Sequence, residues 1–135
     1  MSEQFQLRVV TPRRLVLAEL VREVTAPGTA GEFGVLPDHI TFLSSIETGP
    51  LSYRGDRGRG TLAVRGGFVE VADNVMTVLA DAAEVVAEID AGQAQRDLQD
   101  AASRLQALSP IDPQYAAAEA DRLWAQTRLD LASKK

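Results

Sequence analysis

The chain has 135 residues, of which 45% are hydrophobic and 24% are charged, and its formal net charge is −5. The hydrophobic share is large enough to bury a core, which excludes an intrinsically disordered chain. The acidic balance argues against nucleic acid as a partner. The complete absence of cysteine excludes disulfides and thiolate metal sites.

The sequence shows neither a secretory signal nor a membrane helix. The opening residues Met-Ser-Glu-Gln lack the basic region and the apolar core of a signal peptide. No run of the sequence approaches the roughly 18 apolar residues that a membrane helix needs. We therefore expect a protein that is soluble by itself and reaches a membrane only through a partner.

The larger, N-terminal part of the chain consists of short apolar runs separated by Gly, Pro and Asp. Phe5, Leu7 and Val9 alternate with polar residues, which predicts a half-buried strand. Short strands at this spacing are typical of a β-sandwich or a flattened barrel. We expect strands at 5–9, 15–17, 20–26, 32–36, 40–46, 51–54, 61–65, 68–72 and 75–80.

Turns and a linker are expected between and after these strands. Residues 55–60 predict a hairpin loop, and Asp73-Asn74 predicts a two-residue hairpin turn. Residues 81–88 are acidic and are interpreted as a linker. The apolar residues of the last two strands are expected in the core, namely Phe68, Val69, Val71, Val75, Met76, Val78 and Leu79.

The C-terminal part is rich in alanine and has the apolar spacing of helices. Asp90 is placed to cap a first helix, with Gln93 at the capping-box position. Residues 109–113 break this helix, and Asp112 is placed to cap a second one that begins with proline. The expected apolar stripes are Ala94, Leu98, Ala101, Leu105 and Leu108 on the first helix, and Ala117, Ala120, Trp124, Thr127 and Leu131 on the second.

This change of pattern predicts two domains of different class. Residues 1–86 are expected to form a β-sandwich. Residues 87–135 are expected to form an antiparallel two-helix hairpin, because about five residues join the helices.

Catalytic and metal-binding sets are hard to assemble from this sequence. Its one histidine, His39, rules out a multi-histidine metal site and an HExxH zinc helix. No Gly-x-Ser-x-Gly turn accompanies it. Gly55, Gly58 and Gly60 lack the Lys-Ser/Thr ending of a phosphate loop. We therefore expect a non-catalytic protein with no catalytic residue and no bound metal.

The stretch Gly31-Glu32-Phe33-Gly34-Val35-Leu36-Pro37-Asp38-His39 carries a specific pattern. It resembles the Gly-Glu-x-Gly-hydrophobic-x-Pro-x-His signature of the epsilon subunit of F-type ATP synthases. The resemblance covers nearly the whole chain. Three further blocks agree in order and spacing, namely Leu7 to Pro12, Leu43 to Gly49, and Gly66 to Val71 with Asn74 to Asp81.

The resemblance implies a ten-stranded β-sandwich followed by two helices. It also implies a place in the central stalk of a proton-translocating enzyme, bound to the gamma subunit and standing on the ring of c subunits. The sandwich would couple ring rotation to the catalytic head. The hairpin would regulate by extending along gamma, meeting the beta subunits and restraining ATP hydrolysis. Such a chain is a peripheral membrane protein on the cytoplasmic face of the bacterial plasma membrane.

The family positions that meet gamma and the c-ring correspond here to Gly31, Glu32, Pro37, Asp38 and His39. For Glu32, contact with the polar loops of the c-ring and simple solvation are both open. For His39, one alternative is contact with gamma or the c-ring. The other is a ring that satisfies backbone groups of its own loop.

Some bacterial members of the family bind ATP through Ile/Leu-Asp-x-x-Arg-Ala at the start of the first helix. The same place here has Ile89, Asp90 and Ala94 in common with that motif, but Gln93 replaces the arginine. Losing the arginine removes a fixed charge that would face the phosphates. The alternative for this segment is a helix start that is merely capped by Asp90.

Three further residues resemble parts of the same nucleotide site. Glu84 matches an acidic residue upstream, and Arg122 and Arg128 lie on the second helix, where Trp124 replaces another arginine. With two arginines missing, we expect no cofactor and weak or absent ATP binding. A free-standing nucleotide-sensing module is the alternative function, and Gln93 counts against it.

Arginines on the hairpin also leave two alternatives open. They either meet an acidic surface on the beta subunits or form a solvated helix face. The residues concerned are Arg96, Arg104, Arg122 and Arg128, with the terminal lysines.

Overall fold

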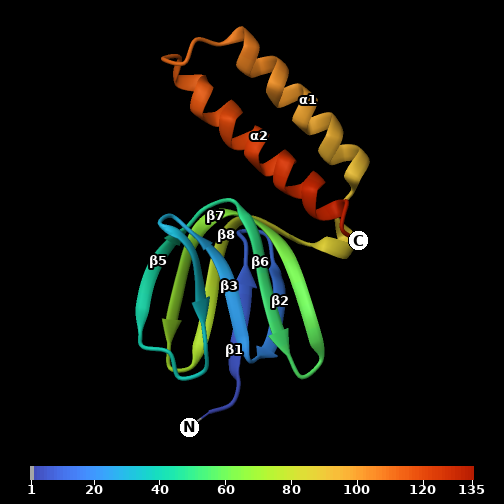
Figure 1. Cartoon of the computed structure of the whole chain (residues 1–135). Helices are drawn as coiled ribbons and strands as arrows, with labels where there is room; N and C mark the ends of the chain where they lie inside the picture. Colours follow the sequence, from blue (N-terminus) through green and yellow to red (C-terminus); the bar gives the residue numbers. More distant parts are fainter. Residues whose placement is uncertain (1) are drawn as a thin grey trace. The chain divides into compact units, whose positions relative to one another are not determined.

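The computed structural model describes residues 2–135. The chain divides between Val85 and Val86 into two compact units, the first made of strands and the second of helices (Figure 1). Among the described residues, no helix is both long enough and apolar enough to cross a membrane.

The N-terminal unit contains β1 (Phe5–Val10), β2 (Leu15–Val21), β3 (Glu23–Gly28), β4 (Gly31–Val35), β5 (Phe42–Ile46), β6 (Gly49–Gly55), β7 (Gly58–Ala72) and β8 (Val75–Val85). The C-terminal unit contains a short 3-10 helix, η1 (Val86–Glu88), followed by α1 (Ala91–Ala107) and α2 (Pro113–Ala132).

The strands form two layers that the long β7–β8 hairpin joins (Figure 1). The second half of β7 pairs with β5 and with the first half of β8, which also pairs with β1, and β1 pairs with β2. We call this layer A. The first half of β7 pairs with β6 and with the end of β8, β6 pairs with β3, and β3 pairs with β4. We call this layer B.

One apolar core lies between the layers. Alternate residues of each strand point inward, as the period of two requires. The largest fully buried side chains of the strands come from both layers: Leu7, Val9, Val69, Val71 and Met76 from layer A, and Val24, Val35, Leu51, Leu62 and Val64 from layer B. The sandwich expected from the sequence is thus confirmed as an architecture.

Two glycines allow β7 to pass from one layer to the other without ending. Gly66 and Gly67 have φ values of 54° and 119°, which favour glycine strongly. A Cβ atom on Gly67 would also collide with the carbonyl oxygen of Leu79 on β8. The expected break between 61–65 and 68–72 is therefore a bend within a single strand.

The described residues form eight strands, not the ten that the family resemblance implies. The difference arises because β7 and β8 each serve both layers, so counting each half separately gives five strands a layer. The expected linker at 81–88 is also wrong in part, since β8 continues to Val85. The Asp73-Asn74 turn is confirmed, with φ values of 53° and 61° that suit a two-residue hairpin.

The helix caps agree with the sequence. The Asp90 side chain accepts a hydrogen bond from the Gln93 backbone N–H at 3.0 Å, and Asp112 accepts one from Gln114 at 2.8 Å with Pro113 in the first turn. The two helices run antiparallel. Arg104 Nη2 lies 3.0 Å from Asp121, and Arg128 Nη1 lies 3.3 Å from Asp97, so early positions on α1 meet late positions on α2.

The predicted stripe is confirmed on α1 and confirmed in part on α2, where Thr127 and Leu131 are buried and Trp124 is half-buried. Ala94 and Ala101 are buried, and Leu98, Leu105 and Leu108 are half-buried. On α2, Ala117 and Ala120 are exposed. The buried positions there are Ala118, Ala125, Thr127, Arg128, Leu131 and Ala132. Three consecutive alanines at 116–118 give the pattern no preference for one face, so only the first part of the predicted stripe, at Ala117 and Ala120, was wrong.

We predict that Gly67→Ala lowers the free energy of unfolding of the N-terminal unit by about 3 kcal/mol or more. The reason is that backbone strain and the clash with β8 add. Denaturant unfolding followed by circular dichroism measures the loss. Gly58→Ala is the matched control, because Gly58 has a φ of 116° and nothing within 4 Å of its added Cβ. Equal losses for the two variants would contradict the proposed bend.

Candidate functional site

A hollow of about 400 Å3 runs along the open side of the sandwich, between β4 and β5. In the described part of the chain no ladder joins these two strands, since β4 pairs with β3 and β5 pairs mainly with β7. The lining includes three of the five predicted partner-binding residues, Gly31, Glu32 and His39. The fold therefore brings these residues to one surface feature.

Aromatic side chains form one wall of this hollow. The Phe33 and Phe42 rings meet edge to face with centroids 5.8 Å apart, and the His39 ring lies 5.0 Å from Phe42. Phe33 and Phe42 are half-buried and pack against the core, so they close the gap between the two layers.

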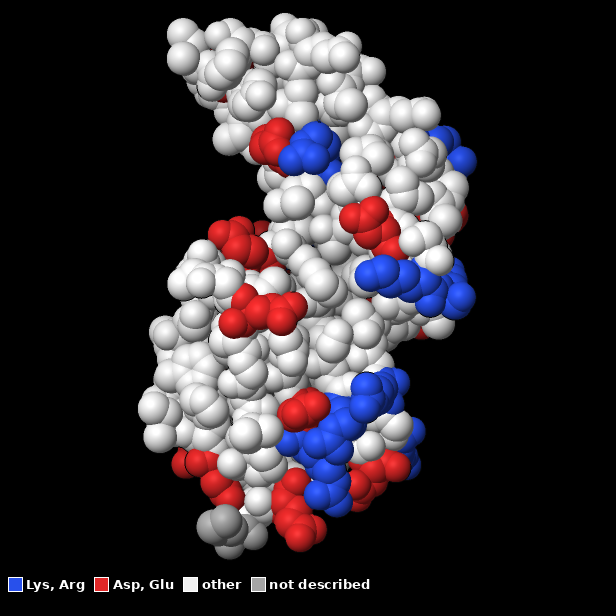
Figure 2. All heavy atoms as spheres, viewed as in Figure 1, with Lys and Arg blue, Asp and Glu red and all other residues white. Residues whose placement is uncertain are grey.

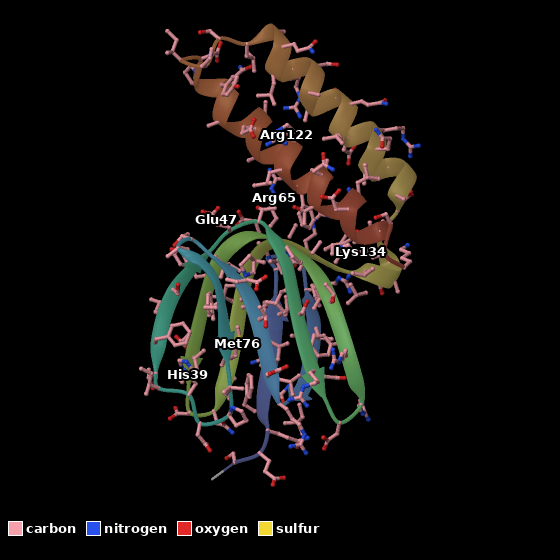
Figure 3. The ribbon with its side chains drawn as sticks, in the orientation of Figure 1. His39, Glu47, Arg65, Met76, Arg122 and Lys134 are labelled. Carbon is pink, nitrogen blue, oxygen red and sulfur yellow. The ribbon has the colours of Figure 1, made fainter. Side chains whose placement is uncertain are left out.

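His39 lies on the loop between β4 and β5 (Figure 3). Its Nδ1 donates a hydrogen bond to the Ile40 carbonyl at 3.0 Å. One of the two alternatives, a ring that satisfies its own loop, is therefore present in the structure. Contact of His39 with a partner stays a prediction.

Pro37 and Asp38 form the turn before His39 and do not line the hollow. Asp38 has a φ of 60°, its backbone N–H donates to Asn74 Oδ1 at 2.8 Å, and its carboxylate accepts from the Ser2 backbone N–H at 2.6 Å. Asn74 also donates to the Gln4 carbonyl at 2.8 Å. These bonds explain Asp38 as a structural residue that ties the loop to the N-terminal strand.

Gly31 and Glu32 are exposed at the start of β4, next to the turn that joins it to β3. The φ of Gly31 is 116°, and an added Cβ would meet nothing within 4 Å. Glu32 forms no side-chain hydrogen bond or ion pair with the described residues. Its charge is thus available to a partner, although the structure does not identify one.

Sequence reasoning missed a row of apolar side chains on the outer face of layer A. Register places Phe68 opposite Leu79, Leu79 beside Val10, and Val10 opposite Leu15. Phe68, Leu79 and Leu15 are 53%, 51% and 47% exposed. Leu43, on the neighbouring β5, is 72% exposed. The five residues Leu15, Val10, Leu79, Phe68 and Leu43 form what we call the apolar row.

The expectation that Phe68 and Leu79 are core residues is therefore wrong. Their neighbours Val69 and Val78 are fully buried, and a strand sends successive side chains to opposite faces. The signal was visible in the sequence, because an antiparallel strand with one solvated face alternates apolar with polar residues. The segment Val75 to Ala80 has Thr77 as its single polar residue and does not alternate, which indicates that both faces are covered.

The residues of the nucleotide-like motif are engaged in holding the helices together. Ile89 is buried and its carbonyl accepts from Lys135 Nζ at 2.6 Å. The hydrogen bond from the Gln93 N–H lowers the pKa of the capping Asp90 carboxyl below its usual value. Ala94 is fully buried. The cap that one of the two alternatives describes is therefore present in the structure, and nucleotide binding at this segment stays a prediction.

Gln93 joins a chain of polar contacts in place of the missing arginine. Its Nε2 donates to Asp97 at 2.7 Å, its Oε1 accepts from Arg96 at 3.0 Å, and Asp97 also accepts from Arg128. Arg128 is 9% exposed and its guanidinium lies 5.8 Å from the centre of the Trp124 ring.

The remaining two residues of the motif are elsewhere. Arg122, on α2 (Figure 3), donates to Glu119 of the same helix, which raises the pKa of the Arg122 guanidinium. Glu84 lies on β8, in the other unit. Among the described residues, no group of three His, Asp or Glu side chains is placed to hold a metal ion.

Comparisons with known proteins agree along the whole chain. Residues 4–86 match the family model of the ATP synthase Delta/Epsilon chain, β-sandwich domain. The ATP synthase epsilon chain of Trichlorobacter lovleyi is 42% identical over 134 residues, covering 99% of this chain and 97% of the relative. The epsilon chain of Nitratidesulfovibrio vulgaris is 43% identical over 130 residues, covering 96% and 97%.

Solved structures share the fold at lower sequence identity. A chain of the mitochondrial ATP synthase of Euglena gracilis matches with a TM-score of 0.79 and 24% identity, covering 98% of this chain and 83% of that one. A chain from the central stalk and c-ring of the Tetrahymena thermophila mitochondrial ATP synthase matches with a TM-score of 0.63 and 20% identity, covering 96% and 93%.

We predict that the isolated chain binds ATP with a dissociation constant no tighter than about 1 mM, or roughly −4 kcal/mol. Asp90, Gln93 and Arg128 already bond to other residues of the hairpin, and no arginine stands at position 93. Isothermal calorimetry measures the affinity, with Gln93→Arg as the comparison variant, which should bind more tightly. A micromolar constant for the unmodified chain would contradict this account.

Proposed function

The chain belongs to the ATP synthase epsilon-chain family, and from this premise we propose that its sandwich binds the gamma subunit through the apolar row. It is a non-catalytic subunit of the synthase. In the central stalk, the sandwich couples rotation of the c-ring to the catalytic head. The observation that carries the proposal is the exposure of four large apolar side chains on one sheet face, where Leu79 pairs with Phe68 and, through Val10, lies near Leu15, and Leu43 lies on the next strand opposite Glu70.

The chemistry of the apolar row suits a permanent partner. Leu15, Leu79, Phe68 and Leu43 are each about half exposed or more in the isolated chain. A contiguous apolar patch on a soluble protein marks an interaction site. Burying apolar area stabilises a complex by about 25 cal/mol per Å2. A subunit that transmits torque needs such a stable contact, which supports gamma as the occupant.

We further propose that the turn between β3 and β4 contacts the polar loops of the c-ring. Glu32 is an exposed carboxylate without a partner in the described residues, and Gly31 beside it leaves room for close approach. Polar and charged contacts set the orientation of partners more than their affinity. The hollow that includes His39 continues this surface toward β5.

We propose a division of labour between residues 1–86, which bind the rotor, and residues 87–135, which regulate. The hairpin seam contains buried alanines such as Ala94, Ala101 and Ala118, which bury little apolar area each. Because these alanines bury little apolar area, the two helices can separate at a modest cost in free energy. In that state, the exposed Arg96 and Arg104 would meet acidic surfaces of the beta subunits and restrain hydrolysis.

The family and the proposed partners together give a location. A subunit that stands on the c-ring works at the cytoplasmic face of the bacterial plasma membrane, held there by its partners. Its role in proton transport is indirect.

We predict that Phe68→Glu and Leu79→Glu each weaken binding to purified gamma subunit at least tenfold, or about 1.4 kcal/mol. A carboxylate carried into an apolar contact loses its hydration without gaining a partner. Biolayer interferometry with immobilised gamma measures the affinity of each full-length variant.

Ser52→Glu is the matched control for this experiment. It adds the same charge to an exposed position on the outer face of layer B, which the proposal leaves outside the gamma contact. Thermal unfolding must show that all three variants fold. If Phe68→Glu and Leu79→Glu bind gamma as well as Ser52→Glu does, the apolar row is not the interface.

A further inference from the structure

The outer face of layer B differs in chemistry from the apolar row. Near the β6–β7 hairpin it carries arginines and small hydroxyl side chains, and Figure 2 shows Lys and Arg side chains gathered over this end of the sandwich with Asp and Glu side chains among them. Two of these arginines are paired with carboxylates, Arg22 with Asp56 and Arg54 with Glu23.

Two arginines lie directly opposite each other on neighbouring strands. Register pairs Arg54 of β6 with Arg59 of β7, so both side chains project from the same face. Like charges in directly opposed positions destabilise a sheet. Arg59 is exposed and forms no ion pair or side-chain hydrogen bond with the described residues. The fold therefore gains nothing evident from this second arginine.

The Arg54 side chain is held by one of its nitrogens, and its other N–H donors are not used by the described residues. Its Nε lies 3.2 Å from the Glu23 carboxylate on β3. The terminal nitrogens of Arg54 make no hydrogen bond within residues 2–135. A guanidinium oriented through Nε can still present its outer edge to an oxyanion in a bidentate manner.

Hydroxyl groups form the floor beside the two arginines. Register places Thr25, Ser52 and Thr61 side by side on β3, β6 and β7. Ser52 Oγ lies 3.2 Å from Thr61 Oγ1. These arginines and hydroxyls line a hollow of about 310 Å3 together with Tyr53, Gly60 and Glu23, whose carboxylate pairs with Arg54 Nε.

The turn of the hairpin that carries the arginine pair is held by hydrogen bonds from Arg22 and Gln4 to Asp56. Arg22 Nε lies 2.6 Å from Asp56 in the tight turn, and Gln4 Nε2 lies 2.9 Å from the other oxygen of the same carboxylate. The hydrogen bond from Arg22 lowers the pKa of the Asp56 carboxyl. Asp56 is thus committed to positioning the turn, and does not neutralise Arg59.

We propose that this hollow, lined by Arg54, Arg59, Ser52, Thr61 and Thr25, binds a phosphate-class oxyanion. The two guanidinium groups supply charge and paired N–H donors, and the hydroxyls donate to the remaining oxygens. A tetrahedral anion that accepts from several directions matches this donor set better than a planar carboxylate. Inorganic phosphate and the phosphate monoester of a lipid headgroup share the required chemistry.

The first experiment titrates the 15N-labelled full chain with sodium phosphate and follows backbone amide shifts. We expect saturable shifts confined to 52–61 and the facing part of β3, with a dissociation constant in the millimolar range. Sodium chloride at matched ionic strength should not reproduce them. Shifts that are spread over the chain, or that follow ionic strength alone, would overturn the proposal.

Variants then test which residues hold the anion. Arg59→Gln should weaken phosphate binding about tenfold, and Arg54→Gln should do the same, because each removes a charged donor. Arg13→Gln, at an exposed position of the β1–β2 turn, is the matched control and should bind normally. Without phosphate, Arg59→Gln should unfold at the same or a higher temperature than the unmodified chain. Normal phosphate binding by the Arg54→Gln/Arg59→Gln double variant would refute the site.

A second arm separates the two sources of phosphate. Vesicles of phosphatidylcholine with one fifth phosphatidic acid are sedimented with the full chain, and vesicles of phosphatidylcholine alone are the control. Retention that Arg59→Gln abolishes supports the site and identifies the lipid headgroup as a source. Binding of inorganic phosphate without retention on vesicles supports the site with free phosphate as its ligand. If neither probe engages Arg54 and Arg59, the proposal is wrong.

Discussion

The bend at Gly66 and Gly67 is the constraint on which the sandwich depends. These residues adopt positive φ values, and the absence of a Cβ on Gly67 lets β7 pass close to the Leu79 carbonyl. One continuous hairpin, β7–β8, can therefore provide strands to both layers. The covalent continuity joins the two layers into one body.

The same bend gives the sandwich two outer faces of different chemistry. The second half of β7 contributes Phe68 to the apolar row on layer A, whereas the first half contributes Arg59 and Thr61 to the polar face of layer B. Apolar area binds a permanent partner with high stability, and exposed guanidinium groups suit a small exchangeable anion. In this account, one face joins the rotor and the other remains open to solution.

Helix-capping patterns were predicted correctly from the sequence, whereas assigning apolar strand residues to the core by their hydrophobicity failed in part. Asp90 and Asp112 were identified as caps because a carboxylate just before a helix accepts a hydrogen bond from a backbone N–H of its first turn. The partner-binding motif around Glu32 and His39 came from family resemblance, and the structure gathers part of it at one hollow while Asp38 serves the loop. Phe68 was assigned to the core because hydrophobicity alone does not distinguish a buried face from one that a partner covers. The Arg54–Arg59 pair could not be predicted from the sequence, because it depends on the register between β6 and β7.

The central claim is that the outer face of layer A is covered in the assembled enzyme. Because the natural chain contains no cysteine, single cysteines at Phe68, Leu79 and Ser52 each provide one unambiguous labelling site. Maleimide labelling rates are measured on the free chain and on the chain assembled with the gamma subunit and the c-ring. The account predicts that assembly slows labelling strongly in Phe68→Cys and Leu79→Cys and leaves Ser52→Cys unchanged. Unchanged rates at Phe68 and Leu79, with protection of Ser52, would contradict it.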